Sequence, residues 1–369
     1  MAPRRSVGLD IVRIFAAVLV IICHSGYFSL GITYRALSFA GILAVELFFA
    51  LSGFLVGSSL MRMAAANDPA PMIKRFYVNR AARILPLYWV SLLLMALVSH
   101  RMIPLSNLFF VQNFFPDSLG FLAVSWTLSV EMWFYVLIPP VMCPLVKILS
   151  RKFSREGAVF AAIGILCVVP FCLRVLGALH SRQDWDLGIR KQIPMRLDAL
   201  VMGVFFAALK NYRPEAFRKL SRNPLCLLVS IGGMLGIYKL YGITLVDDAV
   251  FNASVPAKIF FFTVVPLLSC LLVAGLYDCP LLQKLDGCWL GKALNGLSTL
   301  TYGVYLFQLA VFSSLGPVFY PRNYWENWFG FPLSIGLTLV LAVIGYFLVE
   351  RPSGKLRDKL LSRMQQTAS

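Results

Sequence analysis

The sequence predicts an all-α, polytopic integral membrane protein with about ten transmembrane helices. Of its 369 residues 59% are hydrophobic, and the mean hydropathy is +0.76. Soluble domains contain roughly 45–50% apolar residues, and one of this length could not bury the excess. The apolar residues also recur in runs close to the roughly 20 residues that cross a bilayer. Because lipid offers the backbone no hydrogen-bond partners, each run should be a helix.

Ten runs qualify as spans, and the sixth is the shortest. The first run follows MAPRR and imitates a signal peptide. However, Asp10 and Arg13 interrupt it and no clear A-x-A site follows, so we expect an uncleaved first span. The expected spans are residues 7–27, 38–60, 84–99, 125–148, 157–177, 196–210, 224–241, 255–276, 296–318 and 329–350.

The basic residues predict an orientation for these spans. With the N-terminus in the cytoplasm, 23 Lys and Arg lie in inner loops and 8 in outer loops, as the positive-inside rule requires. We therefore expect both termini in the cytoplasm, a transmembrane domain over residues 1–352 and a basic cytoplasmic tail over 353–369. The net charge of +17 then lies beside anionic lipid, and no basic domain indicates a nucleic-acid partner.

The cysteine and histidine pattern gives no sign of a metal centre. Most of the eight cysteines lie in apolar runs, no CxxC occurs, and the chain has three histidines. We therefore expect neither a zinc site nor a disulfide framework.

The first span keeps polar residues in DIVRIFAAVLVIICHSGYF (10–28). Arg13 and His24 share one face of a helix, because eleven residues make about three turns, and they lie about 16 Å apart along its axis. That separation suits the two ends of one long ligand, and Asp10 can pair with Arg13. Three alternatives stay open: Arg13 at the inner head groups, His24 at the outer interface, and a purely structural Asp10–Arg13 pair.

Two further spans place carboxylates at the depth of His24. Glu46 lies in AVELFFALSGFL (44–55) and Glu131 in SWTLSVEMWFYVL (125–137), both in the outer half of the membrane. A histidine held by a carboxylate is a usable general base near neutral pH, although a buried ion-pair network is the alternative. Three candidate substrate-binding side chains lie near Glu131: Ser125, Trp126 and Tyr135.

Other polar residues lie at the ends and in the middle of spans. Arg80 and Arg83 share a helical face at the inner boundary, where they serve either the positive-inside pattern or phosphate binding. Arg196 and Asp198 suggest a structural ion pair. In the ninth span Tyr302 and Gln308 share a face with Tyr305, where packing is the alternative to a functional role.

These segments together resemble acyltransferase family 3, whose membrane proteins O-acylate sugars of surface polysaccharides, lipopolysaccharides and peptidoglycan. Arg13 and His24 match its R-x(10)-H. The resemblance continues through VELFFALSGFL (45–55), Arg80 and Arg83 with ILPLYW (84–89), SWTLSVEMWFY (125–135), RLDALVMG (196–203) and ERP (350–352). One position departs, since the family often has His where this chain has Gln308. Glutamine cannot exchange a proton near pH 7, so we do not count Gln308 among the catalytic residues.

The resemblance implies a membrane O-acyltransferase in a bacterial inner membrane, of the form without an added extracytoplasmic domain. It would transfer an acyl group, by preference acetyl, from acyl-CoA to a hydroxyl of a surface polysaccharide or lipid-linked glycan, without a metal. His24 would act as general base or as acyl carrier. The implied residues are His24, Glu46 and Glu131 for catalysis; Arg13, Arg80 and Arg83 for acyl-CoA; and Asp10, Ser125, Trp126, Tyr135 and Tyr302 for substrate.

A secondary transporter or glycan exporter is the alternative from another class. It too would have about ten spans with charged residues inside the membrane. Two features weigh against it: no second half echoes the first, and the charged residues cluster in the first four spans. Dependence on acyl-CoA separates the two, because a transporter should move its substrate without any.

Overall fold

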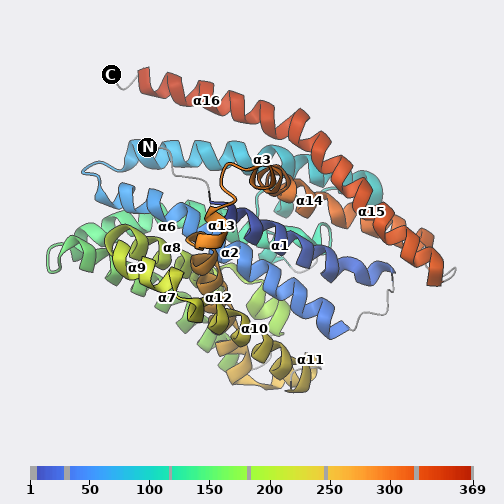
Figure 1. The fold of residues 1–369 in the computed structure, drawn as a ribbon, viewed down its shortest axis with the longest axis horizontal. Helices are drawn as coiled ribbons and strands as arrows, with labels where there is room; N and C mark the ends of the chain where they lie inside the picture. The colour runs from blue at the N-terminus through green and yellow to red at the C-terminus, as the bar shows by residue number, and fades with distance from the viewer. Residues whose placement is uncertain are drawn as a thin grey trace.

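The computed structural model describes residues 6–28, 34–115, 119–180, 184–244, 248–319 and 324–366. Within these ranges the chain is helical and contains no β-strand, which confirms the all-α prediction (Figure 1). Nine helices of the described residues are long and apolar enough to cross a membrane. The protein is therefore a multi-pass membrane protein.

The long helices follow the predicted spans closely. In chain order they are α1 (Val7–His24), α2 (Tyr34–Ala65), α3 (Ala70–Ser99), α6 (Trp126–Leu149), α7 (Arg155–Leu179), α8 (Leu197–Tyr212), α10 (Pro224–Thr244), α12 (Val255–Tyr277), α14 (Trp289–Phe319) and α15 (Tyr324–Gly345). Shorter helices connect them: η1 (Ser25–Phe28), α4 (Leu105–Leu108), η2 (Gln112–Phe114), η3 (Ala123–Ser125), η4 (Trp185–Arg190), η5 (Ile193–Met195), α9 (Pro214–Arg222), α11 (Asp248–Ala253) and α13 (Pro280–Gln283).

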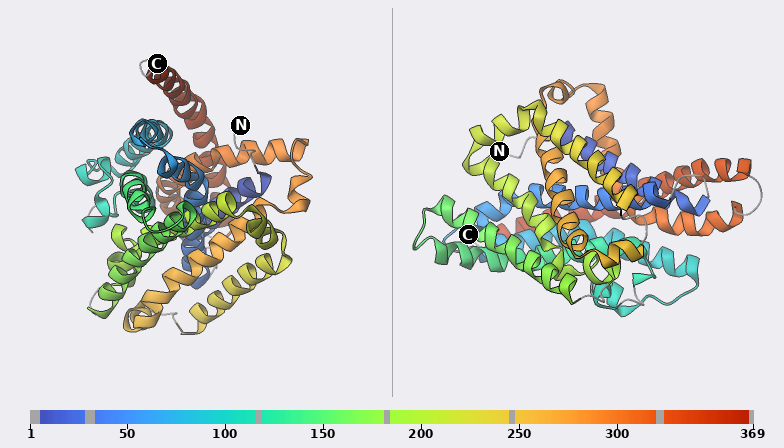
Figure 2. Two further views of the ribbon diagram at one scale, coloured as in Figure 1. Left: turned by 90° about the vertical axis from the view of Figure 1, so that its left-hand side faces the viewer. Right: turned by 90° about the horizontal axis from the view of Figure 1, so that it is seen from below.

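Several helices extend beyond the predicted spans, and in two places a charged segment continues the helix. Helix α3 begins at Ala70 rather than at residue 84, since the basic segment containing Arg75, Arg80 and Arg83 is helical although it is not apolar. At the other end, α15 runs through a π-helical turn, η6 (Tyr346–Glu350), into α16 (Arg351–Gln366). Residues predicted as a tail therefore form a helix that packs against α3 and projects from the bundle (Figure 2).

Helix α8, the predicted sixth span, has 16 residues and lies parallel to α2. Near its start Arg196 pairs with Glu46, and near its end Asn211 donates to Ser58 at 3.0 Å. The contacts therefore advance together along both helices, over about 18 Å of α2 and about 22 Å along α8, at 1.5 Å per residue. Helix α8 thus accompanies α2 over most of a crossing despite its short length.

Helices α1 and α14 also run in the same direction. Ser298 donates to Asp10 at 2.7 Å near the start of both, and Gln308 lies 3.0 Å from His24 farther along both. Because these are the first and ninth of the ten predicted spans, a shared direction requires an even number of crossings from α1 through α12. Counting α8 as a crossing satisfies this condition, which favours ten crossings.

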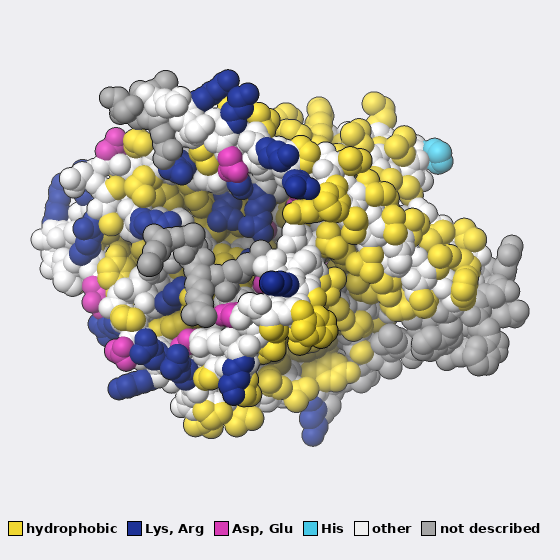
Figure 3. All heavy atoms as spheres, turned by 45° about the horizontal axis from the view of Figure 1, so that its top comes forward, with side chains coloured by type: hydrophobic (Ala, Val, Ile, Leu, Met, Phe, Trp, Pro, Cys, Tyr) yellow, Lys and Arg dark blue, Asp and Glu magenta, His cyan; other side chains and the backbone are white. Residues whose placement is uncertain are grey.

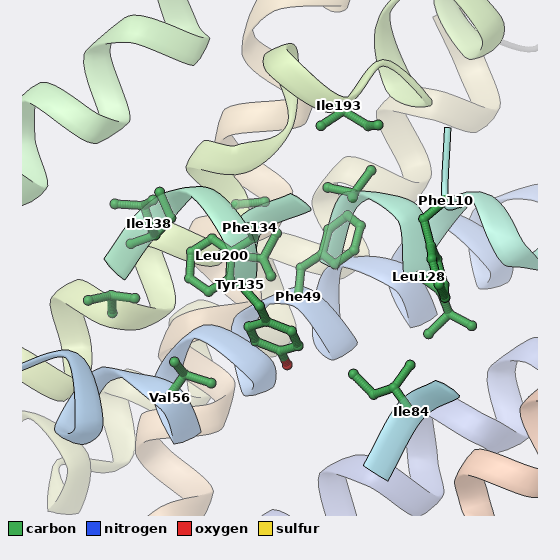
Figure 4. Close-up of a cluster of buried hydrophobic side chains, with 14 of the residues drawn as sticks. Phe49, Val56, Ile84, Phe110, Leu128, Phe134, Tyr135, Ile138, Ile193 and Leu200 are labelled. Carbon is green, nitrogen blue, oxygen red and sulfur yellow. The ribbon is translucent and has the colours of Figure 1, made fainter. Parts of the chain in front are cut away.

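The core lies where α2 packs against α8, α6 and α12, and Figure 4 shows part of it. Phe49 and Val56 of α2 meet Phe134 of α6 and Leu200 of α8 there, all nearly inaccessible to solvent. The ring of Tyr135 lies beside them, with its hydroxyl directed away from the cluster. Glycines allow the closest approach: a Cβ on Gly53 would lie 1.9 Å from the carbonyl oxygen of Leu200.

We expect Gly53→Val to destabilise the protein by at least about 2 kcal/mol, because α2 and α8 must separate to admit the side chain. Thermal unfolding in detergent measures the effect. The matched control is Gly164→Ala in α7, where a Cβ meets nothing within 4 Å. Equal melting temperatures for wild type and Gly53→Val would show that the two helices do not need this close contact.

Candidate active site

A cavity lies between α1, α2, α3, α6 and α14. It encloses about 880 Å³, including the part open to solvent. Its wall is mostly apolar and aromatic, with three arginines and one carboxylate. The residues that line it are Arg13, Val45, Phe48, Phe49, Leu51, Ser52, Leu55, Arg80, Arg83, Ile84, Thr127, Leu128, Glu131, Tyr135, Thr301, Tyr302 and Tyr305.

The cavity continues into a basic hollow at the protein surface, where Figure 3 shows Lys and Arg side chains gathered. The hollow has two adjoining parts, which share Arg83 and Arg357. The first part is lined by five arginines and by no acidic residue: Arg62, Arg75, Arg80, Arg83 and Arg357. Such a cluster suits a ligand with several phosphate groups, because guanidinium groups bind phosphate oxygens through paired hydrogen bonds.

Arg13 and Arg80, both predicted to bind the donor, are held in place by neighbours. Asp10 is buried, accepts from Arg13 at 3.2 Å and accepts from Ser298 at 2.7 Å. This places the Arg13 side chain on the wall of the cavity. The Arg80 guanidinium lies over the ring of Tyr135 at 5.1 Å, a cation–π distance. Asp10, predicted to bind substrate, thus orients Arg13.

His24 lies at the last turn of α1, at the far end of this arrangement from the basic hollow. Its Nδ1 lies 3.0 Å from the carbonyl oxygen of Val20 and 3.0 Å from the amide nitrogen of Gln308. Gln308 is fully buried and lies one turn beyond Tyr305, which lines the cavity. No hydrogen bond or ion pair within the described residues joins His24 to Glu46 or Glu131.

Glu131 faces the cavity, and its Oε1 accepts hydrogen bonds from Ser52 and Tyr135. Tyr302 also lines the cavity and donates to the carbonyl oxygen of Ile84 at 2.9 Å. The structure therefore brings Glu131, Tyr135 and Tyr302 together on one cavity wall. These three predicted site residues can contact a bound ligand.

Glu46 lies elsewhere, in a fully buried ion pair with Arg196. The predicted Arg196–Asp198 pair is wrong, because Asp198 pairs instead with Arg174 of α7 at 2.7 Å. The sequence alone could not predict the Arg196–Glu46 pair, since the two residues are far apart in the chain. These two pairs bind α8 to α2 and α7.

Ser125 and Trp126 lie in packed surroundings at the start of α6. The Ser125 hydroxyl is fully buried and accepts from Gln112 at 3.0 Å. The Arg190 guanidinium lies 4.9 Å from the centre of the Trp126 ring. Neither residue belongs to the cavity wall described above.

Arg190 is itself held by a charged turn that the sequence did not single out. Asp186 accepts from Arg190 at 2.7 Å and from Lys191 at 2.5 Å. Burial alone would raise the pKa of Asp186, but Arg190 and Lys191 outweigh it and lower that pKa below its usual range.

Sequence reasoning also missed Gln308 and Arg357 as site residues. Gln308 was set aside because glutamine does not titrate, yet it contacts His24. Arg357 was assigned to the tail, yet it lines both parts of the basic hollow. The basic residues of 351–363 are the sequence feature that could indicate Arg357. However, only the packing of α16 against α3 shows that Arg357 lines the hollow.

The arrangement is that of a membrane protein whose cavity adjoins an arginine-rich hollow, with a histidine at the other end of the helix that carries Arg13. A family model described as an acyltransferase domain matches residues 6–347. The chain therefore belongs to this acyltransferase family.

Several bacterial proteins resemble the chain. It is 22% identical over 397 residues to a Staphylococcus aureus (strain COL) protein whose name proposes O-acetyltransferase activity, covering 96% of this chain and 58% of that protein. Nodulation protein 10 of Rhizobium leguminosarum bv. viciae is 24% identical over 98% of this chain and 96% of its own length. A Bacillus subtilis (strain 168) protein, named as a proposed peptidoglycan O-acetyltransferase, is 26% identical over 94% and 54%.

The chain thus spans little more than half the length of the Staphylococcus aureus relative. No solved structure matches the chain. Within the described residues no group of three or more His, Cys, Asp or Glu could hold a metal ion.

We expect Arg196→Met to destabilise the protein by about 3–5 kcal/mol, because it leaves Glu46 as an unpaired buried charge. The double variant Glu46→Leu/Arg196→Met should recover most of that stability. Thermal unfolding in detergent tests this, and acyl transfer by the double variant tests the role of Glu46. A stable but inactive double variant would indicate that the Glu46–Arg196 pair serves catalysis as well as the fold.

Proposed function

We propose that the protein transfers an acetyl group from acetyl-CoA to a hydroxyl of a glycan at the outer side of a bacterial inner membrane. The observation that carries this proposal is the five-arginine hollow that opens into an apolar cavity. Coenzyme A has a phosphate-rich head and a long, uncharged arm, and these match the hollow and the cavity in turn.

The helix geometry supports the fit of such a long ligand. Arg13 lines the cavity near the basic hollow, and His24 lies about 16 Å farther along the same helix at 1.5 Å per residue. The phosphates would contact Arg80, Arg83 and Arg357, and the pantetheine arm would extend along α1 and α14. The thioester would then reach the region of His24.

His24 would act as the general base in a direct transfer. Its free ring nitrogen takes the proton of the acceptor hydroxyl while that oxygen attacks the thioester carbonyl carbon. The tetrahedral intermediate then expels the thiolate by breaking the C–S bond, and the thiolate takes the proton from the histidine. The products are the O-acetyl ester and free coenzyme A. Transfer through an acyl-His24 intermediate is the second route, and Glu131 on the cavity wall would help to bind the reacting groups.

The acceptor side of the proposal rests on position and on similarity. His24 lies in the last turn of α1, and the basic sequence MAPRR precedes the other end of this span. A lipid-linked or surface glycan would approach at the His24 end. One relative is named for peptidoglycan O-acetylation, which supports a saccharide acceptor.

We expect His24→Ala to abolish transfer, with a loss of at least about 10²-fold, because general-base catalysis contributes that much or more. The assay supplies membranes with radiolabelled acetyl-CoA and a crude lipid-linked glycan pool, at matched protein levels. Label should enter an alkali-labile glycan product only with wild type. Equal labelling by both proteins would exclude His24 from catalysis.

We expect Arg80→Ala and Arg357→Ala each to raise KM for acetyl-CoA by at least about tenfold, since a lost charge-assisted hydrogen bond costs about 1.5–3 kcal/mol. Acetyl-pantetheine, which lacks the nucleotide and its phosphates, should be used equally by both variants and wild type. Lys359→Ala is the matched control, because Lys359 is an exposed cation on α16 outside the hollow's lining. Unchanged KM for acetyl-CoA in both arginine variants would contradict this donor site.

A further inference from the structure

Two contacts of the His24 ring place opposite demands on Nδ1, and resolving them decides which ring nitrogen carries the proton. Nδ1 of His24 faces two neighbours, the carbonyl oxygen of Val20 and the side-chain amide of Gln308, each at 3.0 Å. A carbonyl oxygen can only accept. With the amide nitrogen toward the ring, Nδ1 would need a lone pair for Gln308 and a proton for Val20 at the same time.

The orientation of the Gln308 amide resolves this conflict. With its nitrogen toward His24, the Oε1 atom of Gln308 is buried without a hydrogen-bond partner among the described residues, so no contact at that end holds the amide in this orientation. Rotating the amide by 180° exchanges oxygen and nitrogen, and the orientation of an amide is decided by its hydrogen bonds. With the oxygen toward the ring, a proton on Nδ1 serves both Val20 and Gln308.

We propose that Gln308 is a positioning residue that holds the proton of His24 on Nδ1 and so leaves Nε2 as the basic nitrogen. The inference rests on the proposed function, in which His24 is the base. Within the described residues, no charged side chain hydrogen-bonds or pairs with His24. The neutral amide therefore takes the place that a carboxylate holds in many histidine-dependent sites.

This assignment fixes the path of the proton. Nε2 takes the proton of the acceptor hydroxyl, and the ring becomes a cation with protons on both nitrogens. The Nδ1 proton stays between the oxygens of Val20 and Gln308, which stabilise that cation. Nε2 then gives its proton to the departing thiolate. Gln308 itself neither gains nor loses a proton.

Nitrogen NMR of the protein in detergent tests the tautomer directly. The chain has three histidines, and His100 and His180 are exposed, so the variant His100→Asn/His180→Gln, purified with a histidine-free tag, leaves His24 as the single imidazole. After ¹⁵N-histidine labelling, we expect Nδ1 to give the signal of a protonated nitrogen and Nε2 that of an unprotonated one. The reverse assignment would overturn the proposal, whether or not the protein is active.

Kinetics test whether the tautomer matters. Gln308→Leu keeps the approximate volume but removes the acceptor, and we expect kcat to fall about 10- to 100-fold with KM for acetyl-CoA unchanged within about twofold. Gln308→Glu keeps an acceptor oxygen and should retain most of the activity. Thr338→Val is the matched control, because it removes the hydrogen bond of another buried side chain, 2.8 Å to Ser334, away from His24.

The outcomes separate this proposal from the proposed function. If His24→Ala is inactive while Gln308→Leu is fully active, the positioning role fails and the function stands. If His24→Ala is as active as wild type, the proposed base fails first, although the NMR result still reports the tautomer. If both Gln308 variants lose activity equally, or KM rises together with the loss, Gln308 serves the packing of α14 rather than the proton of His24.

Discussion

The buried charge pairs around α8 are the constraint on which the rest of the structure depends. Arg196 and Arg174 are both fully buried. Arg196, at the start of α8, pairs with Glu46 of α2, and Arg174 of α7 pairs with Asp198 of α8. Apolar helix surfaces pack against lipid tails nearly as well as against one another, so they select a neighbouring helix only weakly. A charged side chain in the membrane is costly unless it is paired, so it selects a specific partner. Arg174 also donates to Thr263 of α12 at 2.8 Å. Four helices are thereby fixed relative to one another.

Fixing α8 against one face of α2 leaves the other face of α2 for the cavity. Gly53 approaches the backbone of α8 closely, while Ser52, the preceding residue, lines the cavity and donates to Glu131. Successive residues of one helix thus serve the fold and the site. A loss of register between α2 and α8 would therefore move Ser52 and the hydrogen bond that it makes with Glu131.

Hydropathy alone predicted most of the fold, because a membrane demands long apolar helices and little else has that composition. It placed α1 and α12 well, but it cut α3 short, since hydropathy cannot distinguish a charged helical extension from a loop. The candidate site could be predicted less completely from the sequence. The sequence identified Arg13, Arg80 and Glu131 as unusual for a membrane, and these line the cavity. It could not pair Glu46 with Arg196, because hydropathy places two carboxylates at the depth of His24 and only the packing of α8 brings Arg196 to one of them.

The parallel course of α1 and α14 joins the same two helices at two well-separated points. Asp10 and Ser298 join the two helices near the basic hollow, and His24 and Gln308 join them near the other end. The same helix pair therefore sets the positions of Arg13 and His24 relative to each other. Because both contacts lie on rigid helices rather than on loops, the distance between them is fixed by the helical rise. Under the proposed function, a ligand that contacts both Arg13 and His24 must match this distance in length as well as the arginines in charge. This requirement favours a donor with a long arm over a short activated acyl group.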